Sequence, residues 1–337
     1  MAGNGSSSIR IGLVGAGAIA QIAHLPVLRR FKDVQIAGIA DNDGAKARAL
    51  AQRLGVAAWY TDIEDLLEFG KLDAALICTP NHLHESHVLA ALASGAHVVV
   101  ERPISLTSAG VAKVLKAAEK AKRNVLVAMN HRFRADVQAV HKFIDGGELG
   151  DLATLHSGWH VFRAAKHQLG WRSRRSESGG GVMMDLGLPM LDLALWIARR
   201  PVVTRVSAWL RASGQVDEVA FAQLYTEQGP CIFLNVSWRH VGDSERFWID
   251  VQGTKGSASI APFKVFKELH GQAEDVTPTG ATGREHAFTA SYRSEWAYFL
   301  AGVRGTVKLV PPEDQIQLHK VIEAIYRSAD EQRDVKV

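Results

Sequence analysis

The strongest constraint on the fold of this chain is a repeated alternation of short apolar segments with helical segments in its first 129 residues. The apolar segments are rich in β-branched residues and lie at residues 9–14, 34–40, 74–78, 97–100 and 125–128. Segments that are apolar on both faces are typical of parallel strands covered by helices on both sides. Because crossovers between parallel strands are right-handed, the pattern predicts a doubly wound parallel sheet of the α/β class.

The pattern changes after residue 129, which indicates a second domain. A chain of 337 residues is long enough for two domains with separate cores. The later strands are longer and alternate between apolar and polar residues, as in a mainly antiparallel sheet. We therefore predict a flexible leader at residues 1–8, an α/β domain at 9–129 and an α+β domain with a large open sheet at 130–337.

Composition excludes several classes of protein. Hydrophobic residues make up 47% of the chain and charged residues 22%, which is the balance of a globular protein. The net charge of +4 is not gathered into a basic run, so we expect a small polar partner and no nucleic acid. Residues 9–28 are interrupted by glycines, a histidine and a proline, unlike a signal peptide or a membrane helix. We expect a cytoplasmic protein that does not bind membranes.

A glycine-containing turn follows the first predicted strand. Gly15 and Gly17 are separated by one residue, Ala18 and Ile19 open the next predicted helix, and Ala20 takes the third position of the pattern. In this context the first glycine permits a tight turn and the second lets a pyrophosphate approach the backbone. N–H groups at the start of the helix then bind the phosphates. The turn predicts a Rossmann domain that binds a dinucleotide.

An acidic residue ends the second predicted strand. Asp41 follows Gly17 by 24 residues, close to the separation of about 20 expected for the acid that accepts the ribose hydroxyls. Its carboxylate would repel a 2′-phosphate, and no Arg or Lys follows it immediately. We predict NAD as the preferred cofactor. NADP is the alternative, because Lys46 lies close by in the sequence.

Blocks distributed over most of the chain resemble the Gfo/Idh/MocA family, the relatives of glucose-fructose oxidoreductase and inositol dehydrogenase. The resembling blocks lie at residues 12–20, 78–84, 101–103, 130–133, 179–192, 253–256 and 324–328. The resemblance implies hydride transfer between a nicotinamide and a sugar- or cyclitol-like alcohol. It also implies a homodimer or homotetramer formed through the sheet of the second domain. Besides the glycine turn and Asp41, the cofactor-binding residues it implies are Thr79, Pro80, Asn81, His84, Glu101, Arg102 and Asn130.

Two positions depart from the family pattern. The family's usual Glu-Lys-Pro motif has Arg102 in place of its lysine. A second family motif has an Asp, a His four residues later and another Asp three residues after that. This chain keeps the two acids as Asp185 and Asp192 but has Pro189 in place of the histidine. Arginine stays protonated up to about pH 12 and proline has no side-chain donor, so neither can shuttle a proton. Pro189 fits the first turn of a helix better than a helix interior.

Oxidation of an alcohol releases a proton, so another group must accept it. Asp185 is the first candidate. His160 and His167 are alternatives, because they lie in a stretch that approaches the substrate in relatives. Against a catalytic role, each histidine can equally be a surface or strand-packing residue.

Several residues are candidates for binding the substrate itself. Arg102, Arg163 and Arg172 would form a cationic wall, and guanidinium groups bind carboxylates bidentately, so the substrate is polar and in one reading anionic. Trp171 and Asp192 complete the predicted substrate-binding set. Arg172 in a solvated loop is the competing interpretation.

The HxHxxH pattern of His82, His84 and His87 invites a zinc interpretation, but no Cys or paired carboxylate completes a tetrahedral set, so we predict no metal. The leading prediction is an NAD(P)-dependent oxidoreductase acting on a sugar-, cyclitol- or sugar-acid-like alcohol or ketone. One alternative is a non-catalytic NAD-binding sensor or subunit. Another is an enzyme that uses tightly bound NAD transiently for elimination or lyase chemistry.

Overall fold

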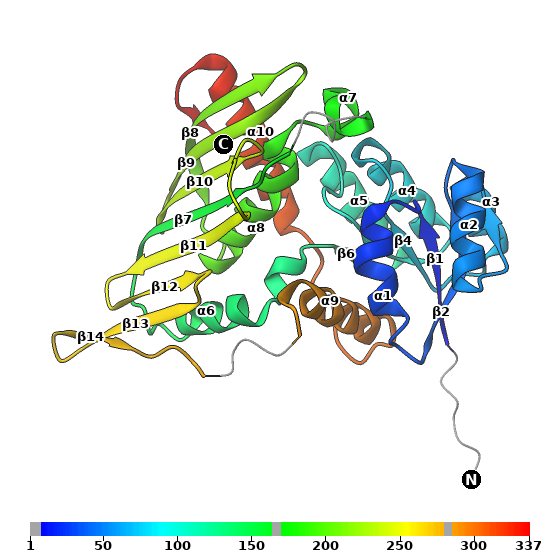
Figure 1. The fold of residues 1–337 in the computed structure, drawn as a ribbon, viewed down its shortest axis with the longest axis horizontal. Coiled ribbons are helices and arrows are strands. Elements are labelled where there is room, and N and C mark those ends of the chain that lie inside the picture. The colour runs from blue at the N-terminus through cyan, green and yellow to red at the C-terminus, as the bar shows by residue number, and fades with distance from the viewer. Residues whose placement is uncertain (1–7, 164–169, 280–284) are drawn as a thin grey trace, which may run out of the picture. The chain divides into compact units, whose positions relative to one another are not determined.

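The computed structural model describes residues 8–163, 170–279 and 285–337, and the chain divides into two compact units. The first unit comprises Met1–Ala128 and Tyr292–Glu313, and the second comprises Met129–Ser291 and Asp314–Val337. Each unit is built around one sheet (Figure 1), which confirms the predicted α/β class.

The sheet of the first unit is parallel and has six strands in the order β3-β2-β1-β4-β5-β6. Every residue of the central strand β4 is fully buried, which explains why its sequence is apolar without alternation. Only β3, two residues long at the sheet edge, was not predicted. The strands are β1 (Ile9–Val14), β2 (Val34–Ala40), β3 (Trp59–Tyr60), β4 (Ala74–Ile77), β5 (His97–Val100) and β6 (Val125–Val127).

Helices connect these strands, as the doubly wound pattern requires. They are α1 (Leu25–Leu28), α2 (Gly44–Leu54), α3 (Ile63–Phe69), α4 (Asn81–Ala93) and α5 (Ser108–Ala121). A π-helical turn, η1 (Ala20–His24), precedes α1. The side chain of Thr107 accepts the N–H of Gly110 and so caps α5.

One segment far along the chain belongs to the first unit and corrects the predicted division at residues 130–337. From Tyr292 onward, α9 (Ala287–Val303) contributes Tyr292, Trp296 and Phe299 to the core that contains β1 and β4. These three side chains are at most 1% exposed. Burial of so much aromatic surface favours this packing strongly, and sequence periodicity does not reveal with which sheet a helix packs.

The second unit contains a nine-stranded sheet in the order β14-β13-β12-β11-β7-β10-β9-β8-β15. Only β7 and β10 pair in parallel, which confirms a mainly antiparallel sheet. Its strands are β7 (Leu152–His160), β8 (Val203–Ser213), β9 (Val216–Thr226), β10 (Cys231–Ser237), β11 (Arg246–Gly253), β12 (Gly256–Ile260), β13 (Lys264–Leu269), β14 (Gln272–Asp275) and β15 (Val335–Lys336).

Helices cover one face of this sheet. They are α6 (Ala135–Asp145), α8 (Leu188–Ile197) and α10 (Asp314–Glu331), together with the π-helical turn η5 (Met183–Gly187). The second unit also contains α7 (Arg175–Ser178) and the turns η2 (Asn130–Phe133) and η4 (Gly170–Ser173). Alternate residues of β10, including Ile232 and Leu234, are fully buried on the covered face. The other face carries Trp209 and Phe221, which are 57% and 41% exposed and lie opposite each other on β8 and β9. The sheet therefore has one core face and one open face.

Candidate functional site

The glycine turn of the first unit has the geometry that a pyrophosphate requires. Gly15 has a φ of +92°, and a Cβ at this position would lie 2.6 Å from the carbonyl oxygen of Cys78. Only glycine fits such a position without strain. Gly17 has no heavy atom closer than 3.9 Å to an added Cβ, so the backbone here is open to a ligand, and a helical segment begins at Ala18. The sequence therefore folds locally into an anion-binding turn.

Asp41 lies beside this turn, as its spacing from the glycines predicts. Its carboxylate accepts hydrogen bonds from the N–H of Ala16 at 2.7 Å and from the N–H of Asp43 at 3.0 Å. Lys46 donates to the same oxygen as Ala16, at 2.8 Å, from a side chain that is 41% exposed. The structure thus brings the acid of the second strand to the turn and places one cation on it.

The loop after β4 carries the next group of predicted cofactor residues. Pro80 precedes α4, Asn81 begins it, and His84 lies in its first turn, 1% exposed. Nδ1 of His84 is 2.6 Å from the carbonyl oxygen of Pro103, and Nε2 is 2.7 Å from that of Thr79. Burial lowers the pKa of His84, and the two carbonyl contacts act in the opposite direction. His84 therefore joins two loops of the first unit.

The HxHxxH pattern does not gather metal ligands. Both nitrogens of His84 face carbonyl oxygens, and Nδ1 of His87 lies 3.1 Å from the Thr79 hydroxyl. Across residues 8–163, 170–279 and 285–337, no three or more His, Cys, Asp or Glu side chains are grouped so as to hold a metal.

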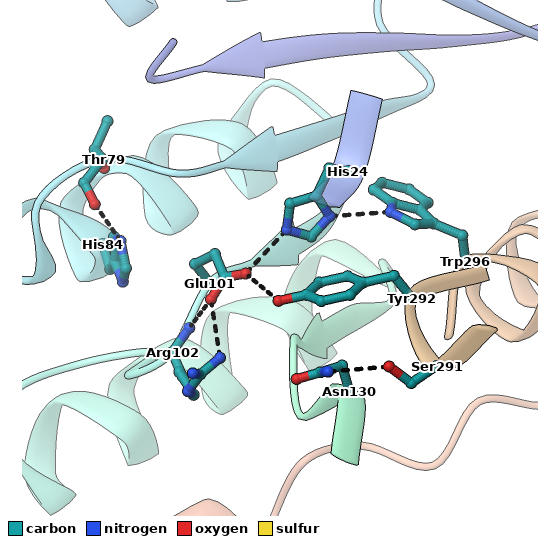
Figure 2. Close-up of polar contacts among 9 residues, drawn as sticks. All are labelled: His24, Thr79, His84, Glu101, Arg102, Asn130, Ser291, Tyr292 and Trp296. Atoms are coloured by element: carbon teal, nitrogen blue, oxygen red, sulfur yellow. Dashed lines mark hydrogen bonds and ion pairs between the residues drawn. The ribbon is translucent and has the colours of Figure 1, made fainter. Parts of the chain in front are cut away.

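Glu101 is the centre of a buried polar network in the first unit (Figure 2). Oε1 is 3.0 Å from Nε2 of His24 and 3.3 Å from the Tyr292 hydroxyl, and Oε2 accepts the backbone N–H of Arg102 at 3.2 Å. Burial alone would raise the pKa of Glu101. The hydrogen bond from His24 and the charge of Arg102 outweigh it and lower the pKa to about 2. The carboxylate is therefore ionised at neutral pH.

In the second unit, Asn130 and Asp192 are buried and already have protein partners. The amide of Asn130, which is 3% exposed, donates to the hydroxyl of Ser291 at 3.0 Å. Asp192 is also 3% exposed. Its carboxylate accepts hydrogen bonds from Nε of Arg132 at 2.7 Å and from the amide of Gln315 at 3.1 Å. The Asp192 carboxylate is therefore engaged in a buried ion pair, and its predicted role in substrate binding stays a prediction.

Asp185 lies in the π-helical turn η5, immediately before α8. Its Oδ2 accepts from the indole N–H of Trp238 at 2.9 Å and pairs with Arg163 at 2.7 Å, with 27% of the Asp185 side chain exposed. Pro189 lies in the first turn of α8, which confirms its predicted placement. The structure therefore joins two predicted residues, Asp185 and Arg163, in one ion pair.

His160 does not join this pair. Its Nε2 is 3.0 Å from the side-chain oxygen of Asn235, and its ring packs edge-on against Trp248. Side chains alternate between the two faces of a strand, so His160 lies on the same face of β7 as His156, which is exposed. The buried Ser157 lies on the opposite face. Burial lowers the pKa of His160. The strand therefore directs His160 to the open face, and its catalytic role stays a prediction.

The remaining predicted residues lie at the edge of the described chain. His167 lies outside the described residues. Trp171 and Arg172 lie in η4, where the Arg172 guanidinium is 4.3 Å from the centre of the Trp171 ring. Arg172 is exposed, in agreement with the alternative interpretation of a solvated residue.

Sequence reasoning missed a carboxylate that holds the start of η5. Asp217 on β9 is 5% exposed and accepts the N–H groups of Gly181 and Met183, both at 2.7 Å. It also accepts the hydroxyl of Tyr326 at 2.9 Å. A Cβ on Gly180 or Gly181 would collide with Tyr326 or Asp217, respectively. The glycine run signals this close approach, but nothing in the sequence names the partner.

Comparisons with known proteins agree with the two-unit architecture. Residues 9–129 match the model of an oxidoreductase family with an NAD-binding Rossmann fold, and residues 137–259 match the GFO/IDH/MocA C-terminal domain. The first match confirms a Rossmann domain for NAD.

Two curated relatives match over nearly all of this chain and of their own. The chain is 24% identical over 353 residues to D-glucoside 3-dehydrogenase of Escherichia coli (strain K12), with 96% of each chain covered. It is 26% identical over 353 residues to inositol 2-dehydrogenase of Rhizobium meliloti (strain 1021), which covers 98% of this chain and 99% of the relative. The solved structure of levoglucosan dehydrogenase with NADH and levoglucosan has a TM-score of 0.88 at 19% identity, covering 98% of this chain and 100% of the other.

Proposed function

Because the chain belongs to the Gfo/Idh/MocA family of NAD-binding oxidoreductases, we propose that it transfers a hydride between NAD and an alcohol or ketone of a sugar- or cyclitol-like substrate. The observation that carries this proposal is the 2.7 Å hydrogen bond from Ala16 to Asp41, which sets a ribose-binding acid beside a glycine turn. The substrate class is supported by relatives that are named as dehydrogenases of a glucoside, of inositol and of levoglucosan.

The cofactor contacts follow from the first unit alone. Bound NAD would supply the hydride acceptor. The N–H groups after Gly15 and Gly17 would hold its pyrophosphate, and Asp41 would accept the hydroxyls of the adenosine ribose. The loops that carry Thr79 and Glu101 follow β4 and β5, at the carboxyl ends of these parallel strands. Ligands of open parallel sheets bind at that edge, which supports cofactor roles for the residues of both loops.

Asp185 is the proposed proton acceptor for alcohol oxidation. Alcohol oxidation breaks the C–H and O–H bonds of the substrate: bound NAD would take the hydride, and the carboxylate of Asp185 would take the hydroxyl proton. Its partial exposure and its position in a π-helical turn, a feature common at functional sites, support this role. Asp185→Asn removes the acceptor at nearly unchanged shape. It should abolish NADH formation and leave the affinity for NAD unchanged.

Arg102 is proposed to donate hydrogen bonds to a substrate hydroxyl or carbonyl oxygen, because it cannot carry the proton. Arg163 is neutralised by Asp185, and Arg172 stacks on Trp171. Neither guanidinium therefore argues for a carboxylate ligand, and we place neutral sugars and cyclitols ahead of sugar acids. Binding of paired neutral and acidic forms of one sugar, measured by calorimetry with NAD present, tests this order. Tighter binding of the acid would reverse it.

The replacement of the family lysine and histidine by Arg102 and Pro189 favours one second function, a non-catalytic NAD-binding protein. A panel of sugars, cyclitols and their acids, incubated with the protein and NAD and read by absorbance of NADH, separates the two. If the wild-type protein turns over a substrate and Asp185→Asn does not, the oxidoreductase function is supported. NAD binding without turnover, together with activity in an Arg102→Lys, Pro189→His variant, supports loss of catalysis in an enzyme scaffold.

The open face of the second unit supports assembly into a homodimer or homotetramer. Trp209 and Phe221 form an exposed cross-strand pair there, and exposed aromatic clusters of this kind mark protein interfaces. We propose a second copy of the chain as the partner. Light scattering tests this by the mass of each protein in solution. We expect the wild-type protein to be an oligomer and Trp209→Glu to be a monomer. A wild-type monomer would exclude it.

A further inference from the structure

Four residues from distant parts of the first unit form a chain of hydrogen bonds that ends at Arg102 (Figure 2). His24 is 0% exposed, Trp296 and Tyr292 are each 1% exposed, and Glu101 is 7% exposed. Such a degree of burial makes every polar atom in the chain costly to leave without a partner. The network therefore admits few alternative arrangements.

The direction of each bond follows from the donors. The indole N–H of Trp296 can only donate, so Nδ1 of His24, 3.0 Å away, accepts. The proton of the His24 ring is then on Nε2, which donates to Oε1 of Glu101 at 3.0 Å. Trp296 thus fixes the tautomer of His24, and His24 fixes the orientation of the Glu101 carboxylate.

The other side of the carboxylate faces Arg102. Oε2 of Glu101 lies 3.5 Å from a terminal guanidinium nitrogen of Arg102 and accepts the backbone N–H of the same residue at 3.2 Å. The Tyr292 hydroxyl donates to Oε1 at 3.3 Å and also accepts a hydrogen bond from the Arg102 side chain. Tyr292 therefore bridges the anion and the cation.

We propose that Glu101 and Tyr292 are positioning residues that fix the guanidinium of Arg102, and that His24 and Trp296 lock Glu101 in the required orientation. The inference rests on the proposed function, in which Arg102 binds a substrate oxygen. The side chain of an arginine has several rotatable bonds. A guanidinium that binds a reacting atom must be held in one orientation, so it needs fixed partners. Burial raises the pKa of Tyr292, so its hydroxyl keeps the proton that it donates to Oε1 of Glu101.

Two conservative substitutions on α9 distinguish positioning from general stabilisation. Tyr292→Phe removes only the bridging hydroxyl. Tyr298→Phe is the matched control, because the Tyr298 hydroxyl lies on the same helix and accepts the N–H of Val310 at 3.2 Å. Trp296→Phe, which removes the N–H that fixes the His24 tautomer, is a second test of the chain one step further from Arg102.

The measurement is the rate at which phenylglyoxal, a reagent for guanidinium groups, modifies Arg102, followed by mass spectrometry of peptides from the whole protein without cofactor. Loss of one hydrogen bond to a charged group should raise this rate about fivefold in Tyr292→Phe and about twofold in Trp296→Phe. Tyr298→Phe should leave it unchanged. Arg10 and Arg123 of the same unit serve as internal references. Both are partly buried and donate to backbone carbonyls, so general loosening of the fold would raise their rates as well.

Equal Arg102 rates in Tyr292→Phe and Tyr298→Phe would overturn the proposal. So would a rise in Tyr292→Phe that Arg10 and Arg123 share. If Tyr292→Phe does not fold, the same comparison between Trp296→Phe and Tyr298→Phe decides, and an unchanged rate there rejects the network. Failure of the wild-type protein to bind NAD in a thermal-shift assay would instead reject the proposed function. The labelling result stands apart from that outcome because no cofactor is present.

Discussion

Two aspartates, one in each unit, have the same local role and different surroundings. Asp41 in the first unit and Asp217 in the second each accept backbone N–H groups at the entry to a helical segment. Asp41 accepts from Ala16, and Asp217 accepts from Gly181 and Met183, with all three bonds at 2.7 Å. The glycines differ: Gly181 makes room for Asp217, whereas Gly15 makes room for the backbone of Cys78. Both turns nevertheless donate backbone N–H groups to an acid from another strand.

The difference lies in the remaining partner. Asp217 also accepts the hydroxyl of the half-buried Tyr326, so its identified donors are two buried backbone N–H groups and one side chain of the second unit. The additional side-chain donor of Asp41 is Lys46, which is 41% exposed and can move aside. A closed set of donors is typical of a structural residue, and an exchangeable donor is typical of a ligand-binding one. The comparison predicts that Asp217 matters for stability and Asp41 for affinity.

The largest effect is expected for Asp217→Ala. The substitution leaves two backbone N–H groups and the Tyr326 hydroxyl without their acceptor, so the free energy of unfolding should fall by about 4 kcal/mol. Urea denaturation followed by circular dichroism measures it. Tyr326→Phe removes one of the three donors and should cost about 1 kcal/mol. A loss below 1 kcal/mol for Asp217→Ala would show that the start of η5 does not depend on this carboxylate.

A second buried carboxylate of the first unit predicts an acid-sensitive step. The pKa of Glu101 falls from 4.5 to about 2 on folding, so its contribution to stability is complete above pH 4.5 and is lost as the pH falls through 2. Between pH 6 and pH 3 the wild-type protein should lose about 2 kcal/mol relative to Glu101→Gln, which cannot titrate. Parallel urea titrations of the two proteins measure this difference. If the two lose stability equally, Glu101 titrates normally.

The sequence predicts Asp41 and not Asp217 for a physical reason. The glycine turn and the acid of the second strand belong to one βαβ unit, so their separation along the chain is set by local geometry. Asp217 and Gly181 meet only because β9 lies beside η5, and such a contact has no fixed spacing. The same limit applies to His24, Glu101 and Trp296, which come together only through tertiary packing.

The fold shows the same division. Strands that are buried on both faces, such as β4, were predicted within one residue of their observed ends. The hairpin of β13 and β14 was not predicted, because β14 is exposed throughout and carries no hydrophobic alternation. The packing of α9 on the first unit was missed, because an apolar helix face does not identify the sheet that it covers.

Asp41→Ala should change affinity more than stability. Removal of the ribose acceptor is expected to weaken NAD binding about tenfold, the effect of a lost hydrogen bond to a charged group. The cost in stability should stay near 1 kcal/mol, because only the N–H of Ala16 is left buried without its acceptor, whereas Asp43 and Lys46 lie close to solvent. Calorimetric titration with NAD and urea denaturation measure the two quantities. An unchanged affinity for NAD would remove the ribose assignment and make Asp41 a structural residue like Asp217.

The smallest effect is expected at Lys46, the exposed side chain that donates to Asp41. Its substitution tests what this donor contributes to the choice of cofactor. Lys46 partly neutralises Asp41 and so weakens the repulsion of a 2′-phosphate. Lys46→Met should therefore raise the ratio of the Kd for NADP to that for NAD about threefold, a size consistent with a half-exposed ion pair. Lys113→Met is the control, since Lys113 pairs with Glu85 at 3.0 Å elsewhere in the unit. The effect should shrink at high salt, because screening weakens exposed pairs. If the ratio falls instead, Lys46 holds Asp41 in the orientation that binds the ribose and does not favour NADP.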